Sequence, residues 1–252
     1  MSTERMALIE TFKRQSEGLQ DKFEARVYKS DKRMPYRLFR PAAIGKLPLV
    51  MYLHGSGGLG DDNLMQLGLG NTFGTRVWLL PDNQKRFPCF VVVPQTDRGW
   101  VNYDLSQEAQ GIVKINDGLG EGAQLALEIV DALCREFSID ERRIYVTGQS
   151  MGGAGTWHMI AARPKLFAAA VACCAAQTAE DAVASLGTRL WNFHGVADQT
   201  VPVKLSRDRI AALQKAGGRP LYTEYAGADH NVWEWAYTEP SLVMWVFDQR
   251  RG

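Results

Sequence analysis

A serine near the middle of the chain is surrounded by glycines. The stretch "IYVTGQSMGGAG" (residues 144–155) passes from β-branched and aromatic residues into a G-x-S-x-G pattern around Ser150 and then into helix formers. A buried strand, a tight turn and a helix would lift the Ser150 hydroxyl out of a sheet, in the arrangement called a nucleophile elbow. Gly148 and Gly152 would then face the neighbouring strand and helix, where only glycine fits. The pattern predicts a nucleophilic serine, although five residues alone also fit an ordinary strand-to-helix turn.

Two later residues could activate this serine. A serine hydroxyl needs a base, usually histidine, and the histidine needs a carboxylate to orient it. Among four histidines, only His230 follows both Ser150 and an aspartate expected at a strand end, Asp198. Asp229 is a poorer candidate because it is adjacent to His230 and would have to fold back on its ring. We therefore predict a triad of Ser150, Asp198 and His230, although singly Asp198 also fits a helix N-cap and His230 an ordinary loop histidine.

A second glycine-rich segment follows an earlier apolar run, in "LVMYLHGSGG" (residues 49–58). Backbone N–H groups in such a loop can approach an anion closely. We expect the N–H of Ser56, with Gly57 as the alternative, to stabilise an oxyanion together with the N–H of Met151 at the start of the next helix. A phosphate-binding loop is disfavoured, since neither G-K-[ST] nor a full G-x-G-x-x-G pattern is present. His54 is expected to orient the loop.

Aromatic residues gather after two predicted strands: Trp100 and Tyr103 in one segment, and Trp233, Trp235 and Tyr237 in the other. Flat apolar rings with a polar edge suit an aromatic acyl group or a sugar-borne alcohol. We predict that Trp100, Gln149 and Trp233 contact the substrate, although either tryptophan equally fits packing against the sheet.

The elements that must position these residues alternate along the chain. Two half-polar segments predict an antiparallel hairpin, and six mainly apolar runs predict strands buried on both faces. Helical patterns lie between the buried runs, which favours a parallel sheet with right-handed crossovers. The predicted strands are residues 23–30, 35–41, 47–55, 87–95, 143–148, 166–175, 188–195 and 220–227, and the predicted helices are residues 122–137, 155–163, 203–218 and 240–250.

This alternation predicts an α/β fold with a doubly wound, mostly parallel sheet of about eight strands and helices on both faces. No pair of helices is expected between residues 175 and 188, so no large cap is predicted there. The stretch from residue 96 to residue 122 is expected to be irregular and could rim the site. Without a large apolar lid, short-chain or aromatic esters are favoured over long-chain lipids.

Composition limits the alternatives. The chain has 252 residues, of which 46% are hydrophobic, and its 29 basic and 28 acidic residues leave a net charge of +1. We expect one domain, residues 1–252, with a helical extension at residues 1–22. The balanced charge argues against nucleic acid or an anionic membrane as partner, leaving a small-molecule ester. Four cysteines in apolar runs suggest buried thiols. Without a signal-like start or an apolar run of spanning length, a cytoplasmic location is expected, or a secreted one if a signal peptide has been removed.

The chain resembles the α/β-hydrolase superfamily, and within it the esterases described as predicted peptidases or phospholipase/carboxylesterase-like proteins. The resemblance is carried by "LHGSGGLGDDN", "VVVPQTDRGW", "RIYVTGQSMGGAGTWHMIAARPKLFAAAV", "WNFHGVADQTVPVKLSR" and "YTEYAGADHNVWEWAY". It implies hydrolysis of carboxylic esters by Ser150, Asp198 and His230, with no metal or cofactor. The chain is also similar to dienelactone hydrolases, which carry cysteine where this chain has Ser150. Amide hydrolysis by the same triad, and a non-catalytic scaffold that binds a small ligand, are the alternatives.

Overall fold

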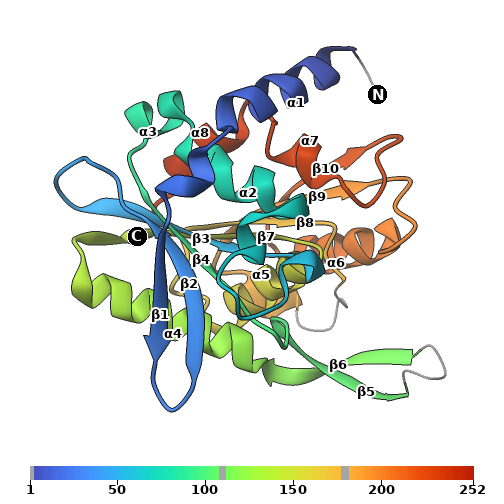
Figure 1. Ribbon diagram of the computed structural model, residues 1–252. Helices are drawn as coiled ribbons and strands as arrows, with labels where there is room; N and C mark the ends of the chain where they lie inside the picture. The colour runs from blue at the N-terminus through green and yellow to red at the C-terminus, as the bar shows by residue number, and fades with distance from the viewer. Residues whose placement is uncertain (1–2, 108–111, 177–181) are drawn as a thin grey trace.

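The central feature of the molecule is an eight-stranded sheet. The structure is a computed structural model that describes residues 3–107, 112–176 and 182–252 (Figure 1). In spatial order the strands are β1 (Glu24–Lys29), β2 (Arg33–Phe39), β4 (Phe90–Pro94), β3 (Leu47–Leu53), β7 (Ile139–Gln149), β8 (Ala169–Cys173), β9 (Arg189–Gly195) and β10 (Leu221–Tyr225).

Strand direction divides the sheet into two parts. β1 pairs with β2, and β2 with β4, in antiparallel register, whereas all the later neighbours are parallel. Every residue of β3 is buried, as expected for a strand covered on both faces. Each of the eight predicted strand segments overlaps one observed strand, and the predicted α/β architecture is confirmed.

Helices cover both faces of this sheet (Figure 1). The α-helices are α1 (Thr3–Ser16), α2 (Thr72–Arg76), α3 (Pro81–Arg86), α4 (Glu121–Glu136), α5 (Met151–Ala162), α6 (Val203–Lys215), α7 (Trp233–Ala236) and α8 (Leu242–Asp248). The 3-10 helices are η1 (Leu19–Lys22), η2 (Ser56–Gly58), η3 (Met65–Leu67), η4 (Leu69–Asn71), η5 (Val77–Leu79) and η7 (Ala182–Ser185). In the part of the chain that the structure describes, no helix is long and apolar enough to cross a membrane.

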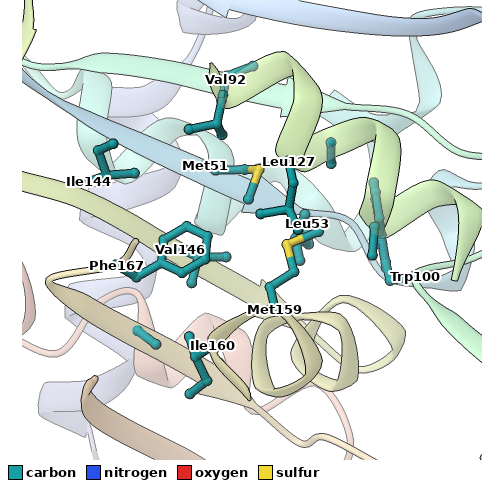
Figure 2. Packing of buried hydrophobic residues seen from close by; sticks show 14 of the residues in the cluster. Met51, Leu53, Val92, Trp100, Leu127, Ile144, Val146, Met159, Ile160 and Phe167 are labelled. Carbon is teal, nitrogen blue, oxygen red and sulfur yellow. The ribbon is translucent and has the colours of Figure 1, made fainter. Parts of the chain in front are cut away.

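Two separate clusters of buried side chains hold the layers together. On one face, α4, α5 and α6 contribute residues such as Ile129, Ile160 and Leu213. Figure 2 shows part of this cluster, where Met159 of α5 and Leu127 of α4 meet side chains of the central strands. α1, α2, α7 and α8 cover the opposite face. Burial of these apolar surfaces from both sides fixes the central strands whose ends carry the candidate site.

The stretch from residue 96 to residue 122 differs from our expectation. It contains a separate two-stranded antiparallel sheet, β5 (Val101–Gln107) and β6 (Ile112–Leu119), which extends away from the main sheet in Figure 1. The prediction of an irregular segment was therefore wrong. Val101, Tyr103 and Leu105 alternate with polar residues, and this period of two was the signal for a strand.

Candidate active site

Ser150 lies in a turn that the surrounding backbone makes very tight. β7 ends at Gln149, α5 begins at Met151, and Ser150 between them has a φ of 53°. A Cβ at Gly148 would lie 2.3 Å from the Gly152 carbonyl oxygen, and a Cβ at Gly152 would lie 2.0 Å from the Leu53 carbonyl oxygen. Both contacts are with backbone that cannot move aside. The local sequence therefore produces this turn because only glycine allows α5 to pack so closely against β3 and β7.

The structure brings the three predicted triad side chains together. His230 Nε2 lies 2.9 Å from Ser150 Oγ, and His230 Nδ1 lies 2.8 Å from Asp198 Oδ2. A carboxylate only accepts hydrogen bonds, so Nδ1 carries the proton and Nε2 is left to accept the Ser150 hydroxyl. Ser150 follows β7, Asp198 follows β9 and His230 follows β10, so three loops at the carboxyl ends of parallel strands build the group. The arrangement can remove a proton from Ser150 and hold it on the imidazole.

The surroundings of Asp198 favour its ionised form. Its Oδ1 accepts the N–H groups of Thr200 at 2.9 Å and Val201 at 2.8 Å, while Oδ2 faces His230. Burial opposes ionisation, but the hydrogen bonds from Val201, His230 and Thr200 outweigh it and lower the pKa of Asp198 below its ordinary value. Asp229 instead uses Oδ1 to accept the backbone N–H groups of Gln199 and of His230.

The glycine-rich loop after β3 lies against the elbow. A Cβ at Gly152 would lie 2.8 Å from the His54 carbonyl oxygen. The N–H groups of Gly55, Gly58 and Leu59 are occupied by Asn71 Oδ1 and by the carbonyls of Gly55 and Ser56, respectively.

Ser56 and Gly57 open η2, and Met151 opens α5, so their N–H groups lack an intrahelical acceptor. Within the described part of the chain these three groups make no hydrogen bond that would compete with a ligand. The structure thus leaves Ser56 and Gly57 both available as the second oxyanion donor, beside Met151.

His54 is bound to the loop rather than to Ser150. Its fully buried ring accepts the Thr96 N–H at Nε2, over 3.2 Å, and Nδ1 lies 2.8 Å from the Gly55 carbonyl, which only accepts. Burial lowers the pKa of His54 to about 4, so the ring is neutral near pH 7. A neutral ring with one donor and one acceptor fits both of its partners.

The three predicted substrate contacts have different environments. Trp100 is 0% exposed, and its indole N–H donates to the His54 carbonyl at 2.9 Å. It has no surface to offer a ligand, so the pocket role is corrected to one of supporting the His54 loop. Trp233 is partly exposed, with its ring centroid 5.4 Å from that of His230 and nearly perpendicular to it. Gln149 Oε1 accepts the Tyr52 hydroxyl at 2.8 Å.

Gln149 and Trp233 meet at Gly70, where a Cβ would lie 3.1 Å from Gln149 Nε2 and 3.0 Å from the Trp233 ring. Both residues therefore border the same corner of the site, and their contact with substrate stays a prediction. The Tyr103 side chain lies outside the described residues. Trp235 and Tyr237 are buried in the core.

Sequence reasoning missed two neighbours of the site. Leu69 has a φ of 48° and a side chain that is 67% exposed, and a Cβ at Gly57 would lie 3.5 Å from its Cδ1. Its segment, "NLMQLGLGN", is apolar without a helical or strand period, which was the available signal. The second neighbour, His194, lies 3.2 Å from Asp198 Oδ2 through its Nε2. No local pattern at His194 indicates this contact.

Among the described residues, one group of side chains has the composition of a metal site. The ligand atoms of Cys174, Asp198 and His230 lie within 4.8 Å of one another. Burial raises the pKa of the Cys174 thiol well above its ordinary value, which disfavours the thiolate that a metal would need. Asp198 and His230 are already hydrogen-bonded to each other. The geometry therefore favours proton transfer over metal binding.

Solved structures that superpose on this chain include an esterase, a hydrolase and a peptidase. A thermostable esterase superposes with a TM-score of 0.83 at 34% identity over 92% of this chain, which spans 64% of that esterase's length. S-formylglutathione hydrolase from Staphylococcus aureus gives a TM-score of 0.63 at 15% identity, over 90% of this chain and 98% of that one. An acylaminoacyl peptidase gives a TM-score of 0.59 at 16% identity, over 91% of this chain and 42% of the peptidase. The two latter likenesses concern the fold alone.

A search of curated proteins finds no match. The sequence profile of the phospholipase/carboxylesterase family matches residues 44–238, which include Ser150, Asp198 and His230. That range extends from just before β3 to just after α7 and so covers most of the chain. This chain, an α/β-hydrolase in fold, belongs to the phospholipase/carboxylesterase family.

Proposed function

We propose that the protein hydrolyses carboxylic esters through an acyl-enzyme on Ser150. The observation that carries the proposal is the continuous hydrogen-bonded path from Ser150 Oγ through His230 to Asp198, with distances of 2.9 and 2.8 Å. Such a path activates a hydroxyl that is otherwise a weak nucleophile at neutral pH. Membership of the phospholipase/carboxylesterase family supports an ester as the bond that is attacked.

The reaction proceeds in two halves. Ser150 Oγ attacks the ester carbonyl while His230 Nε2 takes the hydroxyl proton, and the N–H groups of Met151 and of Ser56 or Gly57 stabilise the oxyanion. The C–O bond to the alcohol then breaks, and His230 returns its proton to the departing alkoxide. Water attacks the acyl-enzyme with His230 again as base, which releases the carboxylic acid and regenerates Ser150.

Short-chain or aromatic esters, such as feruloyl or cinnamoyl esters, are the proposed substrates. The Trp233 ring beside His230 supports an aromatic or compact group at this position, because ring edges and faces pack well against other rings. Between β8 and β9 the described residues contain only the short η7, so these described residues do not form a large lid over a long acyl chain.

The test is hydrolysis of p-nitrophenyl acetate, p-nitrophenyl butyrate, p-nitrophenyl laurate and methyl ferulate by the wild type and by Ser150→Ala. Ser56→Ala is the matched control, since it removes a nearby hydroxyl but keeps the backbone N–H. We expect wild-type and S56A turnover, with S150A folded by circular dichroism but lower in kcat by about 10³-fold or more. Equal rates for S150A and wild type would contradict the proposal.

The same panel tests the substrate class and the alternatives. A rate maximum at the laurate would contradict the short-chain preference while leaving the triad chemistry intact. Anilides matched to the esters test amide hydrolysis. If all substrates are inert, a fluorophosphonate probe distinguishes the remaining cases: labelling of Ser150 indicates a competent nucleophile with another substrate, whereas no labelling indicates a non-catalytic scaffold.

A further inference from the structure

A second imidazole lies directly behind the Asp198–His230 pair. His194, near the end of β9, is 0% exposed. Its Nε2 lies 2.9 Å from the Val201 carbonyl oxygen and 3.2 Å from Asp198 Oδ2, and its Nδ1 lies 2.7 Å from Ser206 Oγ. The reaction proposed above uses none of these contacts, yet they leave both ring nitrogens occupied.

The neighbours of His194 determine which nitrogen carries the proton. The Val201 carbonyl and the Asp198 carboxylate can only accept, so Nε2 must be the donor. Burial lowers the pKa of His194, which keeps the ring neutral and leaves Nδ1 without a proton. Nδ1 consequently accepts the Ser206 hydroxyl. Ser206 thus donates to one side of the ring, and on the other side the Nε2–H faces the Val201 carbonyl at 2.9 Å and Asp198 Oδ2 at 3.2 Å.

The hydrogen bonds continue from Ser206 into the core with the same donor-to-acceptor direction. Asn192 Nδ2 donates to Ser206 Oγ at 3.0 Å, and Trp157 Nε1 donates to Asn192 Oδ1 at 3.2 Å. An indole N–H can only donate, so every hydrogen bond from Trp157 to His194 points in the same direction, toward Asp198. Trp157 belongs to α5, the helix that begins directly after Ser150. The path thus joins the helix of the nucleophile to the carboxylate of the triad through buried side chains.

We propose that His194 is a positioning residue of the catalytic site, which donates its Nε2 hydrogen to Asp198 Oδ2 and so holds the carboxylate in the rotation that orients His230. Backbone N–H groups already fix Oδ1, at Thr200 and Val201. Oδ2 has two imidazole nitrogens within reach: His230 Nδ1, hydrogen-bonded at 2.8 Å, and His194 Nε2, at 3.2 Å. Of these, His230 changes its protonation state during the proposed reaction, whereas His194 takes no part in proton transfer and is the constant partner. The inference rests on the proposed ester hydrolysis.

A purely structural role for His194 would be to satisfy the Val201 carbonyl and fill space in the core. The two roles differ in what a donor at this position restores. Glutamine places an amide N–H at a reach similar to that of histidine Nε2, whereas leucine fills a similar volume without a donor. Phe193→Leu is the matched control, because Phe193 is the neighbouring buried residue on β9 but packs in the cluster on the opposite face of the sheet.

The experiment compares His194→Gln, His194→Leu, Ser206→Ala and F193L with the wild type and S150A. For each, kcat and KM are measured on p-nitrophenyl butyrate, together with thermal unfolding. Proton NMR follows the far-downfield resonance of the His230–Asp198 hydrogen bond. We expect H194L to lose about 10²-fold in kcat, with KM within about twofold of wild type, and to lose the downfield resonance. H194Q should recover most of the kcat and of the downfield resonance. F193L should lower the unfolding temperature but leave the resonance in place.

The outcomes separate this inference from the proposed function. If H194L keeps kcat within about twofold of wild type while S150A is inactive, the inference is wrong and the esterase proposal stands. If H194Q has as low a kcat as H194L, the shape of the side chain matters rather than hydrogen-bond donation. That result also overturns the positioning role of His194. If S150A is as active as wild type, both proposals fail. Should H194L not fold, S206A decides: a several-fold lower kcat at constant KM supports the inference, and an unchanged kcat contradicts it.

Discussion

Two neighbouring parts of the same sheet edge are built in different ways. In the elbow, residues 148–153, a Cβ at Gly152 would lie 2.0 Å from a backbone oxygen of β3. In the adjacent loop, residues 54–71, a Cβ at Gly57 would meet only the flexible end of Leu69, at 3.5 Å. The main chain therefore fixes the nucleophile, whereas side chains such as His54 and Leu69 shape the loop beside it. This difference suggests that substrate preference can change in the loop without disturbing Ser150.

Replacing single glycines by alanine is expected to produce the largest difference between the elbow and the adjacent loop. Gly152→Ala forces β3 and α5 apart, so we expect a loss of about 3 kcal/mol or more in the free energy of unfolding and little remaining turnover. Gly57→Ala is the matched control, and we expect both properties to stay near wild type. Urea unfolding and p-nitrophenyl butyrate hydrolysis measure both variants. If G152A is as stable and active as G57A, the contrast between backbone and side-chain control is wrong.

The dependence of the loop on a buried neutral histidine predicts a pH effect on stability. The folded protein holds the pKa of His54 at about 4, while the unfolded chain takes up the proton near 6.5. Between these values the unfolded state binds more protons, so the free energy of unfolding falls as the pH is lowered from about 6.5 toward 4. The slope from this one group reaches about 1.4 kcal/mol per pH unit.

Urea denaturation between pH 7 and pH 4.5 measures this slope, and His54→Gln removes the titrating group. Buried His194 adds to the slope in the same direction, because its pKa is also lowered. In H54Q the free energy of unfolding should therefore depend less steeply on pH, but some dependence should remain. An identical slope in H54Q and wild type would mean that His54 does not titrate differently in the two states.

The smallest effect is expected at Leu69, which combines a left-handed backbone with an exposed apolar side chain. Glycine there relieves backbone strain, and alanine does not. We expect Leu69→Gly to be more stable than Leu69→Ala by about 1 kcal/mol. If the side chain contacts the acyl group, both variants should show a several-fold lower kcat/KM for butyrate but not for acetate. Equal stability of the two variants would argue against strain, and unchanged kcat/KM would argue against substrate contact.

The sequence predicted those parts of the site that follow from chain order and local pattern. Ser150, Asp198 and His230 each follow a strand whose apolar run is easy to recognise, and parallel strands bring their carboxyl ends to one edge. Because the elbow needs glycine for local steric reasons, Gly148 and Gly152 marked it without knowledge of the tertiary structure. The meeting of these three side chains was therefore accessible before the structure.

What the sequence could not predict depends on tertiary packing. Trp100 follows a strand, like a pocket residue, yet it is buried because Gly155 of α5 leaves room for it: a Cβ at Gly155 would lie 2.5 Å from the Trp100 side chain. The contact of His194 with Asp198 requires the turn closed by Thr200 and Val201. Which N–H groups of the His54 loop are already occupied, those of Gly55, Gly58 and Leu59, also depends on the folded loop and on Asn71. None of these features has a local pattern.

The position of His230 after β10 has a consequence for the order in which the site is made during synthesis. β10 pairs only with β9 in the main sheet, and it is the last of its strands along the chain. A nascent chain that has emerged from the ribosome only as far as α6 therefore contains Ser150 and Asp198 without their base. Since domains are completed from the N-terminus during translation, we expect the serine to stay unreactive until the final strand docks, so that the onset of fluorophosphonate labelling reports completion of the sheet.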